Sequence, residues 1–413
     1  MWSVGWNAAL RHALDLQGFK FRTVLHEGAL TDVYECIRGF KKERLAVKAP
    51  GQGYINYREV AIVREITECN LDKYNIVKCY GDIQMFSKEK MLVFEKLDIN
   101  LERYVVDVQQ NKPLPLSCVR DVAKQMNVAL MALSRQSIIH ADIKPSHIMI
   151  VKQSETPFTF KLIDFGSALW AHDASQGFTP GTVGFMSPEI MLGLPFTQST
   201  DVWSLGCVLA YMFLGHSLFD TESEFNTFKA IHELIGQPSD ELLDEGMYTS
   251  RFYNEIDGIW VLKSPEKTEE KLFTSLDDLK PLSVGVYKRH DPIEREQCVE
   301  LLKKMLQVNP EDRITLEEIM KHPFITGRYP PKVLKWRPFI PFQKKKEISP
   351  LESVNQPSQC PTNTLPSEKP KVSKVQRAKN IFTNIKRNKS INFLKNKHCV
   401  PKQSQNRKHS NAN

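Results

Sequence analysis

Apolar and polar residues alternate along short stretches of the first hundred residues, which is the pattern of β-strands that bury one face. The pattern predicts five short strands or strand-like runs, over 19–25, 33–37, 45–48, 76–80 and 91–94. Residues 57–68 instead carry apolar side chains at helical spacing, namely Val60, Ile62, Val63 and Ile66. This part of the chain is therefore predicted to be β-rich with one main helix.

After Lys96 the spacing of apolar residues becomes helical. It predicts helices over 116–136, 201–214 and 298–306. A short β-rich segment, 138–163, separates the first two and is dense in polar residues. Strands first and helices later predict an α+β protein with two lobes, a small β-rich N-terminal lobe and a larger helical C-terminal lobe.

Charge divides the chain near residue 329. Residues 329–413 contain 19 Lys and Arg against 3 Asp and Glu, whereas residues 1–328 contain 37 against 45. The net charge of +8 therefore comes from the tail, and the body is not a nucleic-acid binder by charge. The predicted organisation is an N-terminal extension (1–17), a small lobe (18–97), a large lobe (98–328) and a basic tail (329–413).

The tail is rich in Pro, Ser, Asn, Gln and Lys and has few aromatic residues. Such a composition buries too little apolar surface to offset the entropy of ordering, so disorder is expected. Its basic blocks, 344–346 and 369–397, have three interpretations: nuclear import, binding to acidic lipid or nucleic acid, or a solvated tail without a specific partner.

The remaining composition is typical of an intracellular protein. Eight scattered cysteines without a C-x-x-C pair argue against a zinc site and a compact disulfide framework, so we expect reduced thiols. No apolar stretch approaches the roughly 18 residues of a spanning helix. The first 17 residues lack a basic leader, so no secretory signal is expected.

The polar segments carry groups suited to phosphoryl transfer. This reaction needs a cation on the phosphates, a carboxylate that holds the cation and a second carboxylate that orients the attacking hydroxyl. The segment H-A-D-I-K-P supplies Asp142 as the carboxylate that orients the hydroxyl, with Lys144 as its companion. D-F-G supplies Asp164 as the carboxylate that holds the cation. Lys48 ends an apolar strand, and Glu59 lies on the following helix, where it could pair with that lysine.

Any one of these short motifs can occur by chance, but chance does not produce several of them in this order and at this spacing. M-S-P-E ends at Glu189, D-V-W-S-L-G begins at Asp201, and N-P-E-D-R ends at Arg313. In the protein-kinase pattern the late arginine pairs with the glutamate, here Arg313 with Glu189. The series predicts a protein-kinase fold.

Residues 19–325 resemble the homeodomain-interacting protein kinases. The shared stretches are H-A-D at 140–142, with alanine where most kinases have arginine, I-D-F-G-S-A at 163–168, I-M-L-G-L-P-F at 190–196, S-L-G-C at 204–207, L-L-K-K-M-L at 301–306 and H-P-F at 322–324. Lysine and proline after the catalytic aspartate are the serine/threonine pattern.

The resemblance implies ATP-dependent phosphorylation of protein Ser and Thr hydroxyls, with Mg²⁺ or Mn²⁺ as the metal. Asp142 would orient the substrate hydroxyl, and Lys144 would neutralise charge on the transferring group. Lys48, fixed by Glu59, would bind the ATP phosphates, and Asp164 would hold the metal. The other implied ATP-binding positions are Gly28, Val33, Ala46, the gatekeeper Phe94, Glu95 and Leu97. Because the family is largely nuclear, we expect a nuclear location with transcription-related partners, and the cytoplasm otherwise.

Two departures affect the nucleotide and the metal. The expected G-x-G-x-x-G-x-V aligns with residues 26–33, where only Gly28 remains. The segment is either a lid with reduced nucleotide affinity or a hairpin kept for its shape. His147 stands where a metal-binding asparagine is expected, although Mg²⁺ prefers oxygen ligands and imidazole suits zinc or manganese better. Slow catalysis, a manganese preference and no catalysis are all compatible with this histidine.

The activation segment, 177–186, also departs from the family. Thr179 stands at the position of a self-phosphorylated tyrosine, and Val183 and Met186 replace arginines. With Ala141 in place of the usual arginine, the sequence offers no obvious cation to bind a phosphate on this loop. We expect a loop that sets its own conformation, with Thr182 hydrogen-bonded near the catalytic aspartate and lysine.

Three hypotheses follow. The first is an active serine/threonine kinase. The second is a pseudokinase that scaffolds partners with weak or no catalysis, favoured by His147 and the eroded glycine loop. The third is nucleic-acid binding by residues 329–413 alone, which would weaken steeply with salt.

Overall fold

The structure is a computed structural model that describes residues 4–51, 54, 56–85, 89–264, 273–280 and 292–329. The chain divides into two units, Met1–Lys332 and Val333–Asn413. The tail from residue 330 onward, with its basic blocks and the predicted disorder, lies outside the described residues. No helix among the described residues is both long and apolar enough to cross a membrane.

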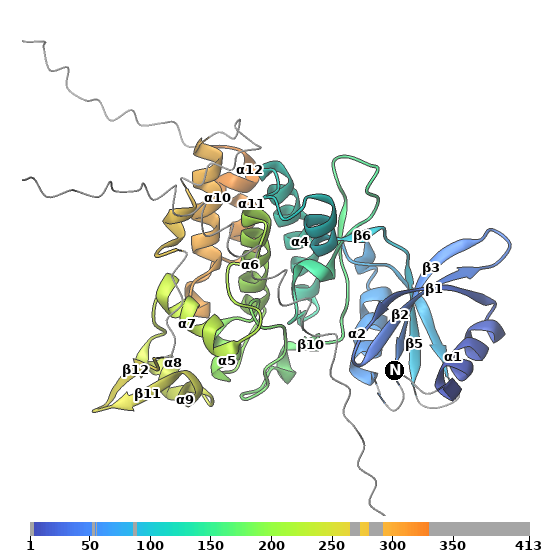
Figure 1. Cartoon of the computed structure of the whole chain (residues 1–413), viewed down its shortest axis with the longest axis horizontal. Helices are drawn as coiled ribbons and strands as arrows, with labels where there is room; N and C mark the ends of the chain where they lie inside the picture. The colour runs from blue at the N-terminus through green and yellow to red at the C-terminus, as the bar shows by residue number, and fades with distance from the viewer. Residues whose placement is uncertain are drawn as a thin grey trace, which may run out of the picture. The chain divides into compact units, whose positions relative to one another are not determined.

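The small lobe is an antiparallel sheet with the strand order β1-β2-β3-β5-β4 (Figure 1). Its elements are α1 (Val4–Leu16), β1 (Phe19–Glu27), β2 (Thr31–Arg38), β3 (Glu43–Pro50), α2 (Tyr57–Glu68), β4 (Cys79–Gln84) and β5 (Lys90–Glu95). The helix predicted over 57–68 is confirmed as α2, and four buried aliphatic side chains form its inner face. The predicted strands over 19–25, 33–37, 45–48 and 91–94 are confirmed, each a few residues longer.

The strand predicted over 76–80 is wrong in its position. Ile76 forms a parallel bridge with Leu162 of the large lobe, and Val77 N donates to Leu162 O (3.0 Å). The strand of the small-lobe sheet begins only at Cys79. The apolar run is therefore divided between two lobes, which a local pattern does not reveal.

Helix α1 was not predicted, and it covers one face of the sheet (Figure 1). Leu10, Ala13 and Leu14 are buried, at positions i, i+3 and i+4 of one helical stripe. They belong to a buried cluster with side chains from β1 to β5, among them Cys36 and Val47. The helix is therefore part of the small-lobe core.

The opposite face of the sheet points toward the groups of the expected site. Strand side chains alternate between faces, so Leu45 and Val47 face the α1 cluster while Ala46 and Lys48 face away from it. Ala46 pairs with Phe94 of β5, and Lys48 pairs with Val33 of β2. The expected adenine and phosphate positions thus lie on one face.

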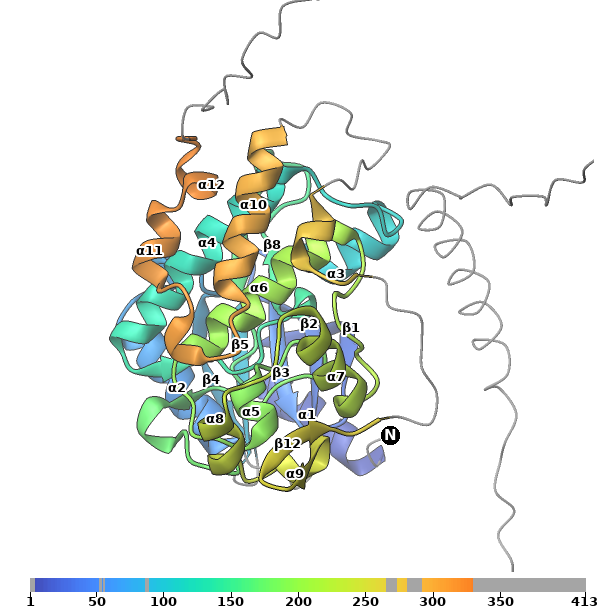
Figure 2. The same cartoon turned by 90° about the vertical axis from the view of Figure 1, so that its left-hand side faces the viewer.

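The large lobe is mainly helical (Figure 2). Its helices are α3 (Leu101–Arg103), α4 (Leu116–Arg135), α5 (Pro188–Leu192), α6 (Ser199–Leu214), α7 (Glu224–Leu234), α8 (Asp240–Glu245), α9 (Thr249–Phe252), α10 (Pro292–Met305), α11 (Leu316–Lys321) and α12 (Pro323–Thr326). Its strands are β6 (Ile99–Asn100), β7 (Ile138–Ile139), β8 (Ile148–Ile150), β9 (Phe160–Leu162), β10 (Leu169–Trp170), β11 (Tyr253–Ile256) and β12 (Ile259–Leu262). The three helices and the β-rich segment predicted for this lobe are confirmed as α4, α6, α10 and β7–β9.

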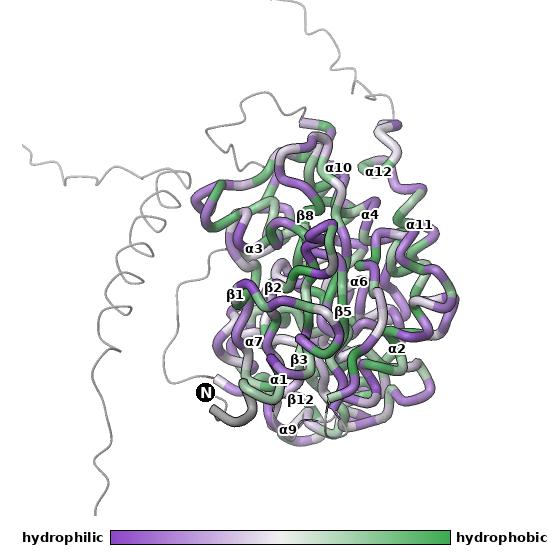
Figure 3. The backbone as a smooth tube through the Cα atoms, turned by 90° about the vertical axis from the view of Figure 1, so that its right-hand side faces the viewer, coloured by the Kyte–Doolittle hydropathy of each residue, from purple (hydrophilic) through white to green (hydrophobic). Residues whose placement is uncertain are grey.

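Helix α6 forms the centre of the large lobe. Every residue from Thr200 to Leu214 is buried, and the helix contacts both α4 and α10. The outer elements are instead amphipathic, and Figure 3 shows hydrophobic (green) and hydrophilic (purple) stretches following one another at short intervals along the tube. A single buried cluster extends from α6 through α4 to α2, so the helix of the small lobe rests on the core of the large lobe.

A buried histidine caps the last helix. His322 Nδ1 accepts a hydrogen bond from Phe324 N (3.2 Å) at the start of α12, which requires an unprotonated Nδ1. Burial, with a smaller contribution from Lys304, lowers the pKa of His322 to about 4. The ring therefore stays neutral in the folded protein under mildly acidic conditions that protonate it in the unfolded chain.

The substitution His322→Asn is expected to flatten part of the acid dependence of stability. In the parent, the unfolded chain takes up a proton on His322 near pH 6.5 and the folded protein only near pH 4. The free energy of unfolding should fall between these values, by at most about 3 kcal/mol, and asparagine caps without titrating. Urea unfolding of both proteins from pH 7 to 4 measures this, and a pH-independent difference between them would contradict it.

Candidate active site

Lys48 connects the two carboxylates expected at the nucleotide phosphates. Its Nζ donates to Glu59 Oε1 of α2 (2.6 Å) and to Asp164 Oδ1 after β9 (2.8 Å). Burial alone would lower the pKa of Lys48, but the two carboxylates outweigh burial and raise it. The lysine therefore stays charged, and α2 is held close to the sheet.

Asp164 is oriented by its own turn as well as by Lys48. Its Oδ1 accepts from Gly166 N (3.0 Å), and its backbone has φ of +65°. Although burial opposes it, the charges around Asp164, led by Lys48, hold the pKa of this carboxyl well below its usual range. Phe165 is buried and meets the ring of His140 edge-on, with 5.3 Å between ring centroids. The carboxylate is therefore ionised and fixed.

The loop that carries Asp142 is fastened to the centre of the large lobe. Asp201 of α6 accepts from the backbone amides of His140 (2.8 Å) and Ala141 (2.9 Å). Ala141 has φ of +60°, a backbone conformation that residues other than glycine rarely adopt. Since Asp201 is buried and satisfies both amides, it stabilises this turn and places Asp142 at its end.

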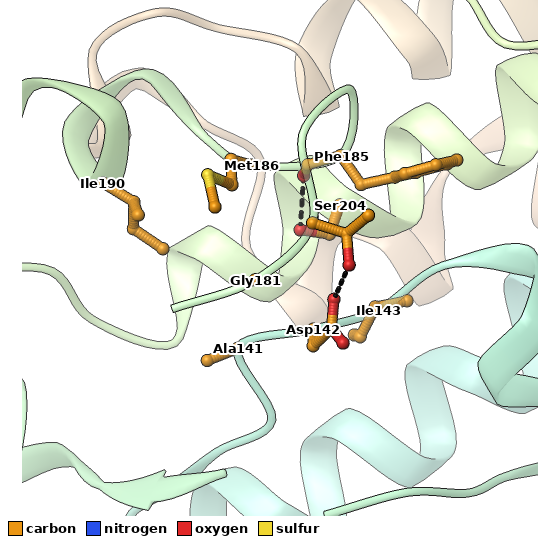
Figure 4. A pocket seen from close by; sticks show the side chains of 9 residues that line it. Ala141, Asp142, Ile143, Gly181, Phe185, Met186, Ile190 and Ser204 are labelled. Atoms are coloured by element: carbon orange, nitrogen blue, oxygen red, sulfur yellow. Dashed lines mark hydrogen bonds between the residues drawn. The ribbon is translucent and has the colours of Figure 1, made fainter. Parts of the chain in front are cut away.

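Asp142, Lys144 and Thr182 form a compact polar group. Figure 4 shows Asp142 of this group beside Gly181 and Ile143. Thr182 Oγ1 donates to Asp142 Oδ1 (2.6 Å), while Lys144 Nζ donates to Asp142 Oδ2 (3.0 Å) and to Thr182 Oγ1 (2.8 Å). The hydrogen bonds of Thr182 predicted from the sequence are confirmed. The activation segment thus contacts the loop of Asp142 directly through Thr182, and this contact needs no phosphate or arginine to bridge the two.

His147 lies between the two aspartates. Its Nδ1 is 2.8 Å from the carbonyl oxygen of Asp142, and its Nε2 is 3.5 Å from Asp164 Oδ2. Burial lowers the pKa of His147 despite these neighbouring carboxylates, so the ring is neutral. A carbonyl oxygen only accepts, which assigns the single ring proton to Nδ1 and leaves the Nε2 lone pair toward Asp164.

This pair of donors suits one divalent cation. Two ligands about 2.1 Å from one cation lie roughly 3–3.5 Å apart, close to the separation of His147 Nε2 and Asp164 Oδ2. No group of three or more His, Cys, Asp and Glu side chains with metal-site geometry occurs among the described residues. The mixed nitrogen and oxygen set fits manganese better than magnesium.

Gly28 is needed for the shape of the β1–β2 turn. A Cβ at this position would lie 2.5 Å from the carbonyl oxygen of Thr31, a distance that forces the backbone to move. Gly28 N donates to Asp32 Oδ1 (3.1 Å), and Tyr34 OH donates to Asp32 Oδ2 (2.9 Å). The turn therefore uses its one glycine amide internally, which favours the hairpin interpretation of this segment over the phosphate-binding lid.

The other expected nucleotide contacts lie along β5 and the chain that follows it. Phe94 is half-buried at the end of β5, opposite Ala46. The Glu95 carboxylate is paired with Lys161 (2.5 Å) and accepts from Lys78 N (2.7 Å). Its side chain is therefore already engaged in contacts within the protein. Leu97 is buried. These positions remain predictions as ATP contacts.

Glu189 and Arg313 form a buried ion pair far apart in sequence. Arg313 donates to both carboxylate oxygens (2.6 and 2.5 Å), and neither side chain is exposed. Arg313 also donates to three backbone carbonyl groups and lies over the ring of Trp203. The pair joins α5, which follows the activation segment, to the turn that precedes α11.

Two contacts of α2 were missed by sequence reasoning, one with Phe178 of the activation segment and one with Trp170 of β10. The guanidinium of Arg58 lies 5.4 Å from the ring centroid of Phe178, and Trp170 Nε1 donates to Glu65 Oε2 (3.2 Å). Arg58 is a cation near the segment where the sequence indicated none. The signal available was its position next to Glu59, and that alone does not identify a partner.

The fold and the motif geometry define a protein kinase, and the comparison with known families agrees. The family described as "Protein kinase domain" matches residues 19–325. The chain therefore belongs to the protein kinase family.

Within that family it is similar to the homeodomain-interacting protein kinases. It is 35% identical to homeodomain-interacting protein kinase 2 of Mesocricetus auratus over 328 residues, which cover 73% of this chain and 28% of that protein. It is 33% identical to homeodomain-interacting protein kinase 1 of Caenorhabditis elegans, over 68% of this chain and 36% of that protein. It is 34% identical to homeodomain-interacting protein kinase 4 of Mus musculus, over 73% of this chain and 54% of that protein.

Proposed function

We propose that the chain is a serine/threonine protein kinase that transfers the γ-phosphate of ATP to protein hydroxyl groups. The observation that carries the proposal is the paired arrangement of two fixed groups. Lys48, Glu59 and Asp164 are in contact on the phosphate side, while Asp142 and Lys144 are in contact on the substrate side. Catalysis of phosphoryl transfer depends mainly on positioning and charge, which these contacts supply.

Each residue has a role that follows from its chemistry. The Lys48 ammonium would bind nucleotide phosphates, and Glu59 would keep it in place. Asp142 would accept a hydrogen bond from the incoming hydroxyl and align its oxygen, and Lys144 would offset the charge that develops on the transferred group. Thr182 now occupies Asp142 Oδ1, so it supports the orientation of this carboxylate from the side of the activation segment.

Protein kinases use ATP and a divalent cation, and here Asp164 and His147 are the residues that would hold the cation. When bound, the cation neutralises charge on the phosphates. The nitrogen of His147 supports Mn²⁺ as a metal that serves at least as well as Mg²⁺. Around the nucleotide base we propose Val33, Ala46, Phe94, Glu95 and Leu97, with Gly28 shaping the turn above it.

The substitution His147→Asn is expected to move the metal preference toward magnesium. An amide oxygen replaces the ring nitrogen, and changes around metal ligands typically alter affinity or activity by about 10–100-fold. The ratio of manganese- to magnesium-supported kcat/KM should therefore fall by at least about tenfold. Phosphate transfer from labelled ATP to a generic acceptor measures the ratio, with each metal as sole cation.

Direct binding provides the control for this experiment. Mn²⁺ binding, followed by electron paramagnetic resonance with a non-hydrolysable ATP analogue present, should be weaker in His147→Asn than in the parent. An unchanged activity ratio and unchanged Mn²⁺ affinity would exclude His147 as a ligand. No transfer by the parent with either metal, above that of Asp142→Asn, would reject the kinase proposal and leave a binding module.

The organisation and setting of the protein are part of the same proposal. We retain the boundaries 18–97, 98–328 and 329–413 for the two lobes and the tail. Residues 1–17 precede the small lobe in sequence, but their helix α1 packs into its core. Similarity to kinases named for homeodomain proteins supports protein substrates and partners involved in transcription, and a nuclear location. The resemblance to a largely nuclear family favours nuclear import as the role of the tail, because its positive charge fits import, nucleic acid and acidic lipid alike.

A further inference from the structure

Phe178 lies between the two lobes, near the start of the activation segment. Its half-buried ring stacks near the buried ring of Phe196, which follows α5 in the large lobe, with centroids 6.5 Å apart and planes 26° apart. On the small-lobe side, the guanidinium of Arg58 lies 5.4 Å from the Phe178 centroid. Figure 1 shows α2 and α5 in different lobes, so this ring links them.

The backbone next to Phe178 is anchored to the large lobe. Gly177 N donates to the carbonyl oxygen of Gly193 (3.0 Å), and Tyr248 OH donates to the carbonyl oxygen of Gly177 (2.9 Å). Gly177 and Gly193 both have positive φ, and a Cβ at Gly193 would lie 2.5 Å from the Tyr248 ring. The ring of Phe178 is therefore presented from a fixed base.

The helix that receives this contact also carries Glu59. Arg58 and Glu59 are consecutive in the first turn of α2, and Glu59 fixes Lys48. A second contact, from Trp170 of β10 to Glu65, holds the other end of α2. In both contacts the large lobe supplies an aromatic side chain, and neither contact needs a phosphate.

We propose that Phe178 is a positioning residue that holds α2, and through it the Glu59–Lys48 pair, without phosphorylation of the activation segment. The proposal rests on the kinase activity proposed above and adds how that activity is maintained. Thr179, beside it, would then be dispensable as a phosphate acceptor. Stacking and cation–π contacts together shift a two-state equilibrium by roughly 5- to 50-fold.

The experiment compares substitutions at Phe178 in the full chain. Phe178→Ala should lower kcat by about 5- to 50-fold, with less than about a threefold change in KM for the protein acceptor. Phe178→Tyr, which keeps the ring, should restore most of the activity. Arg58→Gln should lower kcat in the same direction, and combining it with Phe178→Ala should add little, because both remove the same contact.

Phosphorylation is tested separately with the neighbouring residue. Thr179→Ala and phosphatase treatment of the parent protein should each leave kcat near the parent value. Loss of activity on either treatment would overturn the proposal, because a phosphate would then hold the segment. Equal kcat for Phe178→Ala and the parent would overturn it as well.

Hydrogen exchange distinguishes failure of this proposal from failure of the kinase activity. Amides of residues 57–68 should exchange faster in Phe178→Ala than in the parent or in Phe178→Tyr, whether or not the protein transfers phosphate. If the parent transfers none, faster exchange in α2 still supports the positioning role. Unchanged exchange in α2 would reject that role independently of any assay of catalysis.

Discussion

Replacing Asp142 by asparagine is expected to lower kcat by about 10²–10⁴-fold without unfolding the protein. The carboxylate is held from both sides, by Thr182 at Oδ1 (2.6 Å) and Lys144 at Oδ2 (3.0 Å). Asparagine has the same shape but lacks the charge that attracts the proton of an incoming hydroxyl. Its NH₂ group would also face either Lys144 or Thr182 as a donor, so the polar group would lose a hydrogen bond.

Initial rates of transfer from labelled ATP, at saturating nucleotide and acceptor, measure this loss. Asp240→Asn is a matched control, because Asp240 is an exposed carboxylate on α8 outside the catalytic group. It should keep the parent rate. Retention of more than about a tenth of the parent kcat in Asp142→Asn would contradict the role given to this carboxylate.

Replacing Arg313 by methionine is expected to lower the free energy of unfolding by about 3–5 kcal/mol. The substitution keeps much of the side-chain volume but leaves Glu189 as a buried, unpaired carboxylate, since both partners are fully enclosed. It also removes donors to three backbone carbonyl groups. Urea unfolding at pH 7 measures the change.

Two further proteins separate the causes. The double substitution Arg313→Met with Glu189→Leu removes both charges, so it should recover a large part of the lost stability. Lys152→Met breaks an exposed pair with Glu155 and should leave stability near the parent value. A double variant no more stable than Arg313→Met would show that the unpaired carboxylate is not the main cost.

The sequence predicts those parts of the fold that depend on local patterns. Helix α2 has its whole inner face within twelve residues, so its apolar spacing defines it. Among the side chains that the structure describes in helix α1, only Leu10, Ala13 and Leu14 are buried. They stand among charged residues, and the helix is stabilised by strands that follow it. The division of the run at Ile76 likewise depends on Leu162, which is distant in sequence.

In the candidate site, too, the sequence predicts what short local motifs define and misses what depends on residues distant in the chain. The motifs identify Lys48, Asp142 and Asp164, because each stands in a short segment with a fixed order. The motif pattern also identifies His147 as a substitution, but the state of its ring depends on the carbonyl group of Asp142 and on burial. No local pattern identifies Phe178 as the partner of Arg58, since 120 positions separate the two residues.

Because of helix α1, the folding unit begins earlier in the chain than the stretch that matches the protein kinase family. Similarity to protein kinases begins at residue 19, yet the side chains that cover Cys36, Val47 and Met91 come partly from residues 10–14. A fragment trimmed to the family match would expose this apolar face of the sheet to water and to other chains, which favours aggregation. The shortest stretch that retains the complete small-lobe core therefore begins before the stretch by which the protein is recognised.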